Sequence, residues 1–196
     1  MLSTEAPFTI RKWTVKEYHK LGEMGFFNPE ERVELVSGNI IKMSAKGTAH
    51  TSATRRTATL LRDLLENLAA VYTQDPIALD NNSEPEPDIA VVIIDPFDYA
   101  THHPIPSEVY LIIEVADSSL ALAYDREIKA NIYARSGIVD YWVLNVNDRQ
   151  LHVFREPAED GYQSEVILEE TASISPLQFP DINIAIQEML PPIIPN

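Results

Sequence analysis

The spacing of apolar residues along the chain predicts three helices. Apolar positions recur every three or four residues in these segments, the period of a helix with one face against a core. The segments are residues 15–21 behind a Thr14 cap, residues 48–69 and residues 123–135. Ser136-Gly137 follows the third segment, and glycine is common where helices end. The long helix has an apolar stripe formed by Leu60, Leu61, Leu64, Leu65 and Leu68.

Other segments have the composition and period of β-strands. They are residues 32–36, 39–43, 88–94, 109–115, 139–146 and 150–156. Ser37-Gly38 separates the first two and is typical of a hairpin turn. Residues 88–94 and 109–115 are continuous apolar runs, typical of strands buried on both faces of a sheet. We therefore expect an α+β or α/β fold, with a central mixed sheet flanked by helices and additional strands towards both ends of the chain.

Length and composition limit the class of protein. With 196 residues, 45% of them hydrophobic, the chain suits a single domain over residues 1–196. It has no cysteine, which excludes disulfides, thiolate metal ligands and cysteine nucleophiles. The sequence shows neither a secretory signal nor an apolar stretch of about 20 residues that could span a membrane. We expect a soluble, cytoplasmic protein with no membrane partner.

The charge of the chain is strongly acidic and unevenly distributed. The formal net charge of −15 argues against binding nucleic acid through bulk charge. Eight acidic residues and no lysine or arginine lie in residues 156–196, which we expect to form an acidic C-terminal extension. Residues 42–62 carry five basic side chains and no acid. This basic segment is therefore the expected contact for an anionic ligand.

Two carboxylates are predicted to meet at one edge of the sheet. Asp88 opens the run 88–94, and Glu114 lies near the end of 109–115. If these strands pair as an antiparallel hairpin, the start of the first lies beside the end of the second. Buried carboxylates that repel one another favour a shared proton or cation, and Mg²⁺ or Mn²⁺ suits such oxygen ligands. Each residue alone has a simpler interpretation as an end-of-strand residue that reaches water.

Lys129 is the third member of this candidate site. At about 100° per residue it shares one arc of the predicted helix with Asp125, Ile128, Ile132 and Tyr133. That arc is expected to pack on the sheet, where the ammonium would orient or deprotonate water or stabilise negative charge. The alternative is an Asp125–Lys129 ion pair one helical turn apart on the surface.

Several short motifs, in order, resemble a known family. RVELVSGNI, PDIAVV, LIIEVADSS and YDREIKANIYARSGIVDYWVLNV are similar to the putative restriction endonuclease family of the PD-(D/E)xK nuclease superfamily. The resemblance covers about residues 32–154 and implies a restriction-endonuclease-like core. It also implies that Asp88 and Glu114, with the Val115 carbonyl, bind Mg²⁺. The superfamily pattern has a lysine two residues after the acid, where this chain has Ala116, and Lys129 of the next helix is its implied replacement.

The resemblance points to further residues around this centre. Glu34 matches another acid of the family pattern and is expected to be catalytic, directly or through a metal; the alternative is an ion pair with Arg32 or Lys42. His50 lies where the family often has a histidine, although a lone histidine at the start of a helix is more often a packing residue. His50 and Asp125 are our accessory candidates.

The implied activity is metal-dependent hydrolysis of DNA phosphodiester bonds by an endonuclease. The metal would polarise the phosphate and activate a water. Lys46, Arg55 and Arg56 of the basic segment are the candidate contacts to DNA phosphates. The net acidity predicts weak, metal-assisted and salt-sensitive binding of DNA.

Two other functions stay open from the sequence. One is a catalytically silent nuclease-fold module that binds a partner, favoured by the lysine missing at position 116. The other is a metal-dependent hydrolase of a small phosphoester, although the chain has no glycine-rich phosphate-binding motif. Cutting both DNA strands requires two active sites, so we expect a homodimer, with Tyr141-Trp142 and Ile182–Leu190 as candidate interface segments.

Overall fold

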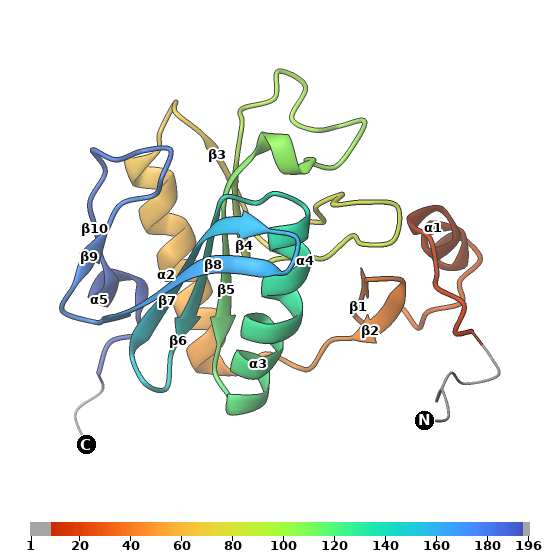
Figure 1. The fold of residues 1–196 in the computed structure, drawn as a ribbon, viewed down its shortest axis with the longest axis horizontal. Helices are drawn as coiled ribbons and strands as arrows, with labels where there is room; N and C mark the ends of the chain where they lie inside the picture. The colour runs from red at the N-terminus through yellow and green to blue at the C-terminus, as the bar shows by residue number, and fades with distance from the viewer. Residues whose placement is uncertain (1–8, 194–196) are drawn as a thin grey trace, which may run out of the picture.

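The computed structural model describes residues 9–193, in which helices cover both faces of a six-stranded sheet (Figure 1). The strands lie in the order β3-β4-β5-β6-β7-β8. Their bounds are β3 Ala70–Tyr72, β4 Ile89–Val92, β5 Val109–Ala116, β6 Asp140–Asn145, β7 Gln150–Ala158 and β8 Gly161–Glu169. Only β5 and β6 pair in parallel among these neighbours, so the sheet is mixed, as predicted.

The two faces of the sheet have separate cores. α2 (Thr48–Leu64) and α5 (Ile186–Met189) cover one face. The other is covered by a continuous helical segment, here called the crossover helix, formed by α3 (Ser119–Ala123), the π-helix η2 (Tyr124–Lys129) and α4 (Ala130–Arg135). The crossover helix connects β5 to β6. Such a long connection is needed because these two strands are parallel neighbours. Within residues 9–193, every helix is too short or too polar to cross a lipid bilayer.

Strand alternation decides which face carries the candidate site. On β5, Leu111, Ile113 and Val115 belong to the core under α2, whereas Ile112 and Ala116 belong to the core under the crossover helix. Side chains two residues apart share a face of a strand. Glu114 therefore lies on the crossover-helix face, where Lys129 can reach it.

The N-terminal elements lie beside the crossover helix (Figure 1). α1 (Val15–Glu23) begins at Thr14, and Thr14 and Glu17 form a reciprocal capping box. β1 (Val33–Val36) and β2 (Asn39–Lys42) form the predicted hairpin. Ser37 and Gly38 have φ angles of 48° and 72°, as a tight type I′ turn requires.

The structure corrects two predicted helices. α2 ends at Leu64 instead of residue 69, and of the predicted stripe Leu64 and Leu68 are exposed. The third helix begins earlier than predicted, at Ser119, and turns into a π-helix at 124–129. The predicted arc assumed 3.6 residues per turn, which does not hold in the wider π-helix. Ile128, placed inward by that arc, is exposed.

The acidic C-terminal segment belongs to the core, which corrects the expectation of an extension outside it. It supplies β8, the short strands β9 (Ser173–Ile174) and β10 (Ile184–Ala185), and α5. Ile184, Ile186 and Met189 are fully buried, as are Tyr141 and Trp142 of β6. The two segments proposed for a homodimer interface thus fill the interior of one chain and do not offer an exposed apolar surface.

Candidate active site

β4 and β5 place Asp88 beside Glu114. The two strands are antiparallel with Ile89 opposite Ile113, so the residue before β4 adjoins Glu114 at one end of the pair. The Asp88 N–H donates to Glu114 Oε2 at 3.2 Å, and the Val115 N–H donates to Asp88 Oδ2 at 3.0 Å. Each carboxylate thus accepts a main-chain hydrogen bond from the opposite strand, which fixes the two side chains at this end of the sheet.

The segment before Asp88 is held in an extended conformation. Pro85 and Pro87 restrict its φ angles, and their carbonyls accept hydrogen bonds at 3.0 Å from the N–H groups of Ile77 and Gln74. Between them, the Glu86 N–H donates to Glu34 Oε2 at 3.1 Å. This segment therefore ties Glu34 of β1 to the strand end that carries Asp88.

Lys129 lies between two buried carboxylates. Its Nζ donates to Glu114 Oε1 at 2.8 Å and lies 3.4 Å from Glu34 Oε2. The Tyr133 hydroxyl donates to the same Glu114 oxygen at 2.9 Å. Lys129, Glu114 and Glu34 are each at most 3% exposed. The ammonium is thus on the inward face that the helical spacing predicted, within reach of the carboxylates.

The simpler ion pairs considered from the sequence are not the ones found. Lys129 pairs with Glu114 and Glu34, and Asp125 is not among its ion-pair partners in the described chain. The basic residues considered as partners of Glu34 bind other acids. They form the pairs Arg32–Glu86 at 2.9 Å and Lys42–Glu31 at 3.0 Å.

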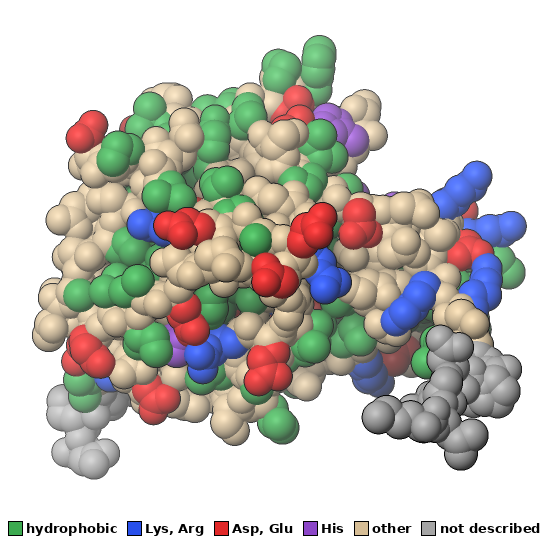
Figure 2. Space-filling model, viewed as in Figure 1, with side chains coloured by type: hydrophobic (Ala, Val, Ile, Leu, Met, Phe, Trp, Pro, Cys, Tyr) green, Lys and Arg blue, Asp and Glu red, His purple; other side chains and the backbone are tan. Residues whose placement is uncertain are grey.

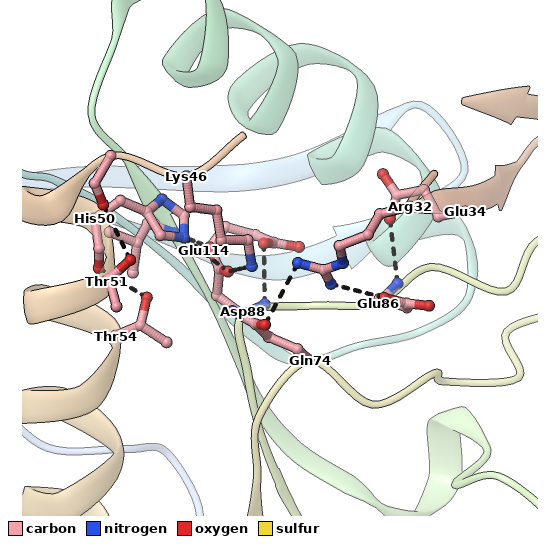
Figure 3. A network of polar contacts seen from close by, with 12 residues as sticks. Arg32, Glu34, Lys46, His50, Thr51, Thr54, Gln74, Glu86, Asp88 and Glu114 are labelled. Atoms are coloured by element: carbon pink, nitrogen blue, oxygen red, sulfur yellow. Dashed lines mark hydrogen bonds and ion pairs between the residues drawn. The ribbon is translucent and has the colours of Figure 1, made fainter. Parts of the chain in front are cut away.

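Asp88 has a further set of side-chain partners, Lys46 and His50 (Figure 3). Its Oδ1 lies 2.8 Å from Lys46 Nζ and 3.0 Å from His50 Nε2. An ionised carboxylate only accepts hydrogen bonds, so His50 donates through Nε2. Lys46, expected on a DNA-binding surface, instead reaches the candidate centre. Arg55 and Arg56 are exposed on α2.

Gly47 allows the start of α2 to lie close to Asp117. Gly47 is the N-cap of α2, and a Cβ built on it would lie 2.6 Å from Asp117 Oδ2, closer than side chains pack. The positive end of a helix dipole favours a carboxylate at this point. A glycine next to Lys46 therefore fixes the position of the loop that carries the lysine.

Asp88 and Glu114 have opposite pKa shifts. Burial raises the pKa of Asp88, but the hydrogen bond and charge of His50, followed by Lys46, outweigh burial and lower it. Burial also raises the pKa of Glu114, and Lys129 offsets this only in part, so the pKa stays raised. Burial lowers the pKa of Lys129, but Glu114 and Glu34 raise it well above its usual value, which favours the charged ammonium.

The candidate residues surround a pocket with a volume of about 520 Å³. Asp125 also lines this pocket, and burial followed by the charge of Glu114 raises its pKa well above the usual value. Tyr124 lines it too, and its hydroxyl donates to Glu34 Oε1 at 3.4 Å. Tyr124 could not be found from the sequence pattern, because its neighbourhood depends on the π-helix and on the distant β1 strand.

The donor set at this pocket suits a hard divalent ion. Asp88 and Glu114 supply carboxylate oxygens, and Val115 also lines this pocket. Asp88 already attracts the ammonium of Lys46, so the position favours positive charge. No cluster of three or more His, Asp or Glu side chains in residues 9–193 forms a complete metal cage. Mg²⁺ fits such an incomplete site, since it commonly binds through one or two carboxylates and keeps several waters or substrate phosphates as further ligands.

Comparisons with known proteins agree with this fold. The solved structures include a putative nuclease belonging to DUF820 from Anabaena variabilis, which matches with a TM-score of 0.70 and 16% identity, covering 90% of this chain and 96% of that one. At this identity the likeness shows the fold alone. No curated protein matches the sequence. A model of the family described as "Putative restriction endonuclease" matches residues 15–187, nearly the whole chain. The chain therefore belongs to the putative restriction endonuclease family.

Proposed function

We propose that the protein is a divalent-metal-dependent endonuclease that hydrolyses DNA phosphodiester bonds. The observation that carries this proposal is the pair of buried carboxylates, Asp88 and Glu114, cross-linked by main-chain hydrogen bonds at the wall of an open pocket. Such a pair is costly in a core that uses it only for stability. Its family membership supports the same class of reaction.

Each side chain has a proposed role. Asp88 and Glu114, with the Val115 carbonyl, would hold Mg²⁺ or Mn²⁺, which when bound polarises the phosphate and lowers the pKa of a water. Lys129 stabilises negative charge and fixes the orientation of Glu114 through the 2.8 Å contact. Glu34 holds Lys129 from the other side, which keeps the ammonium at the pocket. His50 orients the Asp88 carboxylate.

DNA would lie across the pocket mouth. Arg55 and Arg56 are exposed on α2, the helix that supplies His50 to this pocket. Further lysine and arginine side chains gather over the N-terminal elements at the right of Figure 2. Both groups would contact phosphates, whereas the net charge of −15 keeps the affinity low and dependent on metal.

A cleavage assay tests this function. Supercoiled, linear and single-stranded DNA are incubated with the full chain and Mg²⁺ or Mn²⁺, and products are resolved on gels. We expect cleavage by the wild type and by Asp63→Asn, an exposed acid on α2, and a loss of at least about 100-fold in Asp88→Asn and Glu114→Gln. Wild-type protein that binds metal and leaves every substrate intact would contradict the nuclease and favour a catalytically silent module.

A further inference from the structure

Lys46 occupies an unusual position for a surface-loop lysine. It lies between β2 and α2, and its Nζ is 2.8 Å from Asp88 Oδ1. Its side chain is 17% exposed, against 4% for Lys129. Figure 3 shows Lys46 and His50 directed at Asp88 from the same side. The more accessible of the two site lysines is thus the one bound to Asp88.

The hydrogen bonds of Asp88 fully occupy one of its two carboxylate oxygens. Oδ1 accepts from both Lys46 and His50, and Oδ2 accepts from the Val115 N–H. A carboxylate oxygen has two lone pairs, so Oδ1 is fully used. A divalent ion that binds this oxygen must displace one of its two partners.

Lys46 is the partner that can leave. His50 is buried in the first turn of α2, and its carbonyl accepts from the Thr54 hydroxyl at 3.0 Å. Lys46 lies in a stretch without helix or strand, and its neighbours Ala45 and Gly47 are exposed. A lysine also carries its charge on a flexible four-carbon stem, which can re-orient without moving the backbone.

We propose that Lys46 is an exchangeable cation that neutralises Asp88 in the metal-free protein, yields this position to the metal and moves to a phosphate of bound DNA. The proposal rests on the proposed nuclease function. A divalent ion and an ammonium compete for one carboxylate, so removing the lysine favours metal. The displaced ammonium lies at the pocket wall, where it can contact a substrate phosphate. Metal and DNA therefore help each other to bind.

Metal binding without DNA gives the first test. Isothermal titration calorimetry measures the dissociation constant of Mn²⁺ for the full-length wild type, Lys46→Met and Lys16→Met. Lys16 is an exposed lysine on α1, so its variant has the same change in net charge. We expect Lys46→Met to bind Mn²⁺ about tenfold more tightly and Lys16→Met to stay within about twofold of the wild type. Circular dichroism checks that each variant is folded.

DNA binding gives the second test. Fluorescence anisotropy measures binding of a labelled DNA duplex in Ca²⁺, another hard ion for oxygen ligands. We expect Lys46→Met to bind this duplex about tenfold more weakly than the wild type, and Lys16→Met to change by no more than about twofold. The same substitution thus tightens metal binding and weakens DNA binding, a combination that a purely structural lysine would not produce.

Asp88→Asn separates the two ways in which these ideas could fail. If the wild type binds no Mn²⁺, or binds it as well as Asp88→Asn does, the proposed metal-dependent function and the exchange are both wrong. If Mn²⁺ binding depends on Asp88 but Lys46→Met binds it no more tightly than Lys16→Met, only the exchange is overturned. The same holds if Lys46→Met leaves DNA affinity unchanged.

Discussion

The two carboxylates of the candidate site are almost equally buried, yet their surroundings differ. Asp88 is 5% exposed and Glu114 is 3% exposed. Asp88 has two partners of its own, Lys46 and His50, and its pKa is lowered. Glu114 shares one ammonium, that of Lys129, with Glu34, and its pKa is raised. Burial raises both pKa values, but two cationic partners outweigh it at Asp88, whereas at Glu114 one ammonium does not and the neighbouring carboxylates add to the rise.

This difference assigns separate tasks to the two sides. On the Glu114 side, every partner is buried and comes from a strand or the crossover helix, so the arrangement is fixed by the fold. On the Asp88 side, one partner comes from a loop and is partly exposed. We therefore expect Asp88, which stays ionised next to a partly exposed ammonium, to be the better entry point for a metal. The predictions below test whether the two sides differ in this way.

The largest expected loss of stability comes from removing the cation on the Glu114 side. Lys129→Met leaves Glu114 and Glu34 buried without their cation. Removing one partner of a buried ion pair costs about 3–5 kcal/mol, because the remaining charge is uncompensated. Urea denaturation should show a loss of that size in the free energy of unfolding.

A double variant supplies the control for Lys129→Met. Adding Glu34→Gln removes one of the two uncompensated charges and should restore part of the lost free energy of unfolding. If Lys129→Met alone costs less than about 1 kcal/mol of unfolding free energy, the Glu114 side is not held rigidly by buried ion pairs. The proposed difference between the Glu114 and Asp88 sides would then be wrong.

An intermediate loss of stability is expected for a substitution at the start of α2. Gly47→Ala places a Cβ 2.6 Å from Asp117 Oδ2, so the loop that carries Lys46 must shift. We expect a loss of about 1–3 kcal/mol in the free energy of unfolding, measured in urea. Gly22→Ala is the matched control, since its Cβ would meet no atom within 4 Å inside α1. That variant should gain about 0.5–1 kcal/mol, because alanine favours a helix over glycine.

A smaller effect is expected on stability for Lys46→Met. Asp88 keeps its hydrogen bonds from His50 and the Val115 N–H, and the lost ion pair is partly exposed. The cost in free energy of unfolding should be about 1 kcal/mol or less, again in urea. A loss as large as that of Lys129→Met would show that both sides are equally fixed by the fold.

Much of the fixed side could be predicted from the sequence. Antiparallel pairing of the two apolar runs, assumed from the sequence and found in the structure, brings Asp88 next to Glu114. A spacing of 3.6 residues per turn placed Lys129 inward, and Lys129 is buried although residues 124–129 form a π-helix. Ile128, at the edge of the predicted arc, shows where this approximation fails.

The exchangeable side could not be predicted, because no local pattern describes it. Lys46 reaches Asp88 from a loop, 42 residues away along the chain, and loop residues have no period. The C-terminal segment was misjudged for a related reason. An apolar stretch such as 182–190 indicates that a surface is covered but not whether the same chain or a partner covers it. Tertiary packing determines both the contact of Lys46 with Asp88 and the burial of residues 182–190.

The smallest expected effect on the folded protein is at Arg55 and Arg56. Both are exposed on α2, and substituting either by alanine should change the free energy of unfolding by less than about 0.5 kcal/mol. Each substitution should nonetheless weaken DNA binding in Ca²⁺ and reduce the slope of log affinity against log salt concentration by about 1, because one phosphate contact is lost. Their effect on Mn²⁺ affinity should be negligible, unlike that of Lys46→Met. If the salt slope is unchanged in both variants, DNA does not follow α2, and the basic side chains of the N-terminal elements become the principal phosphate contacts.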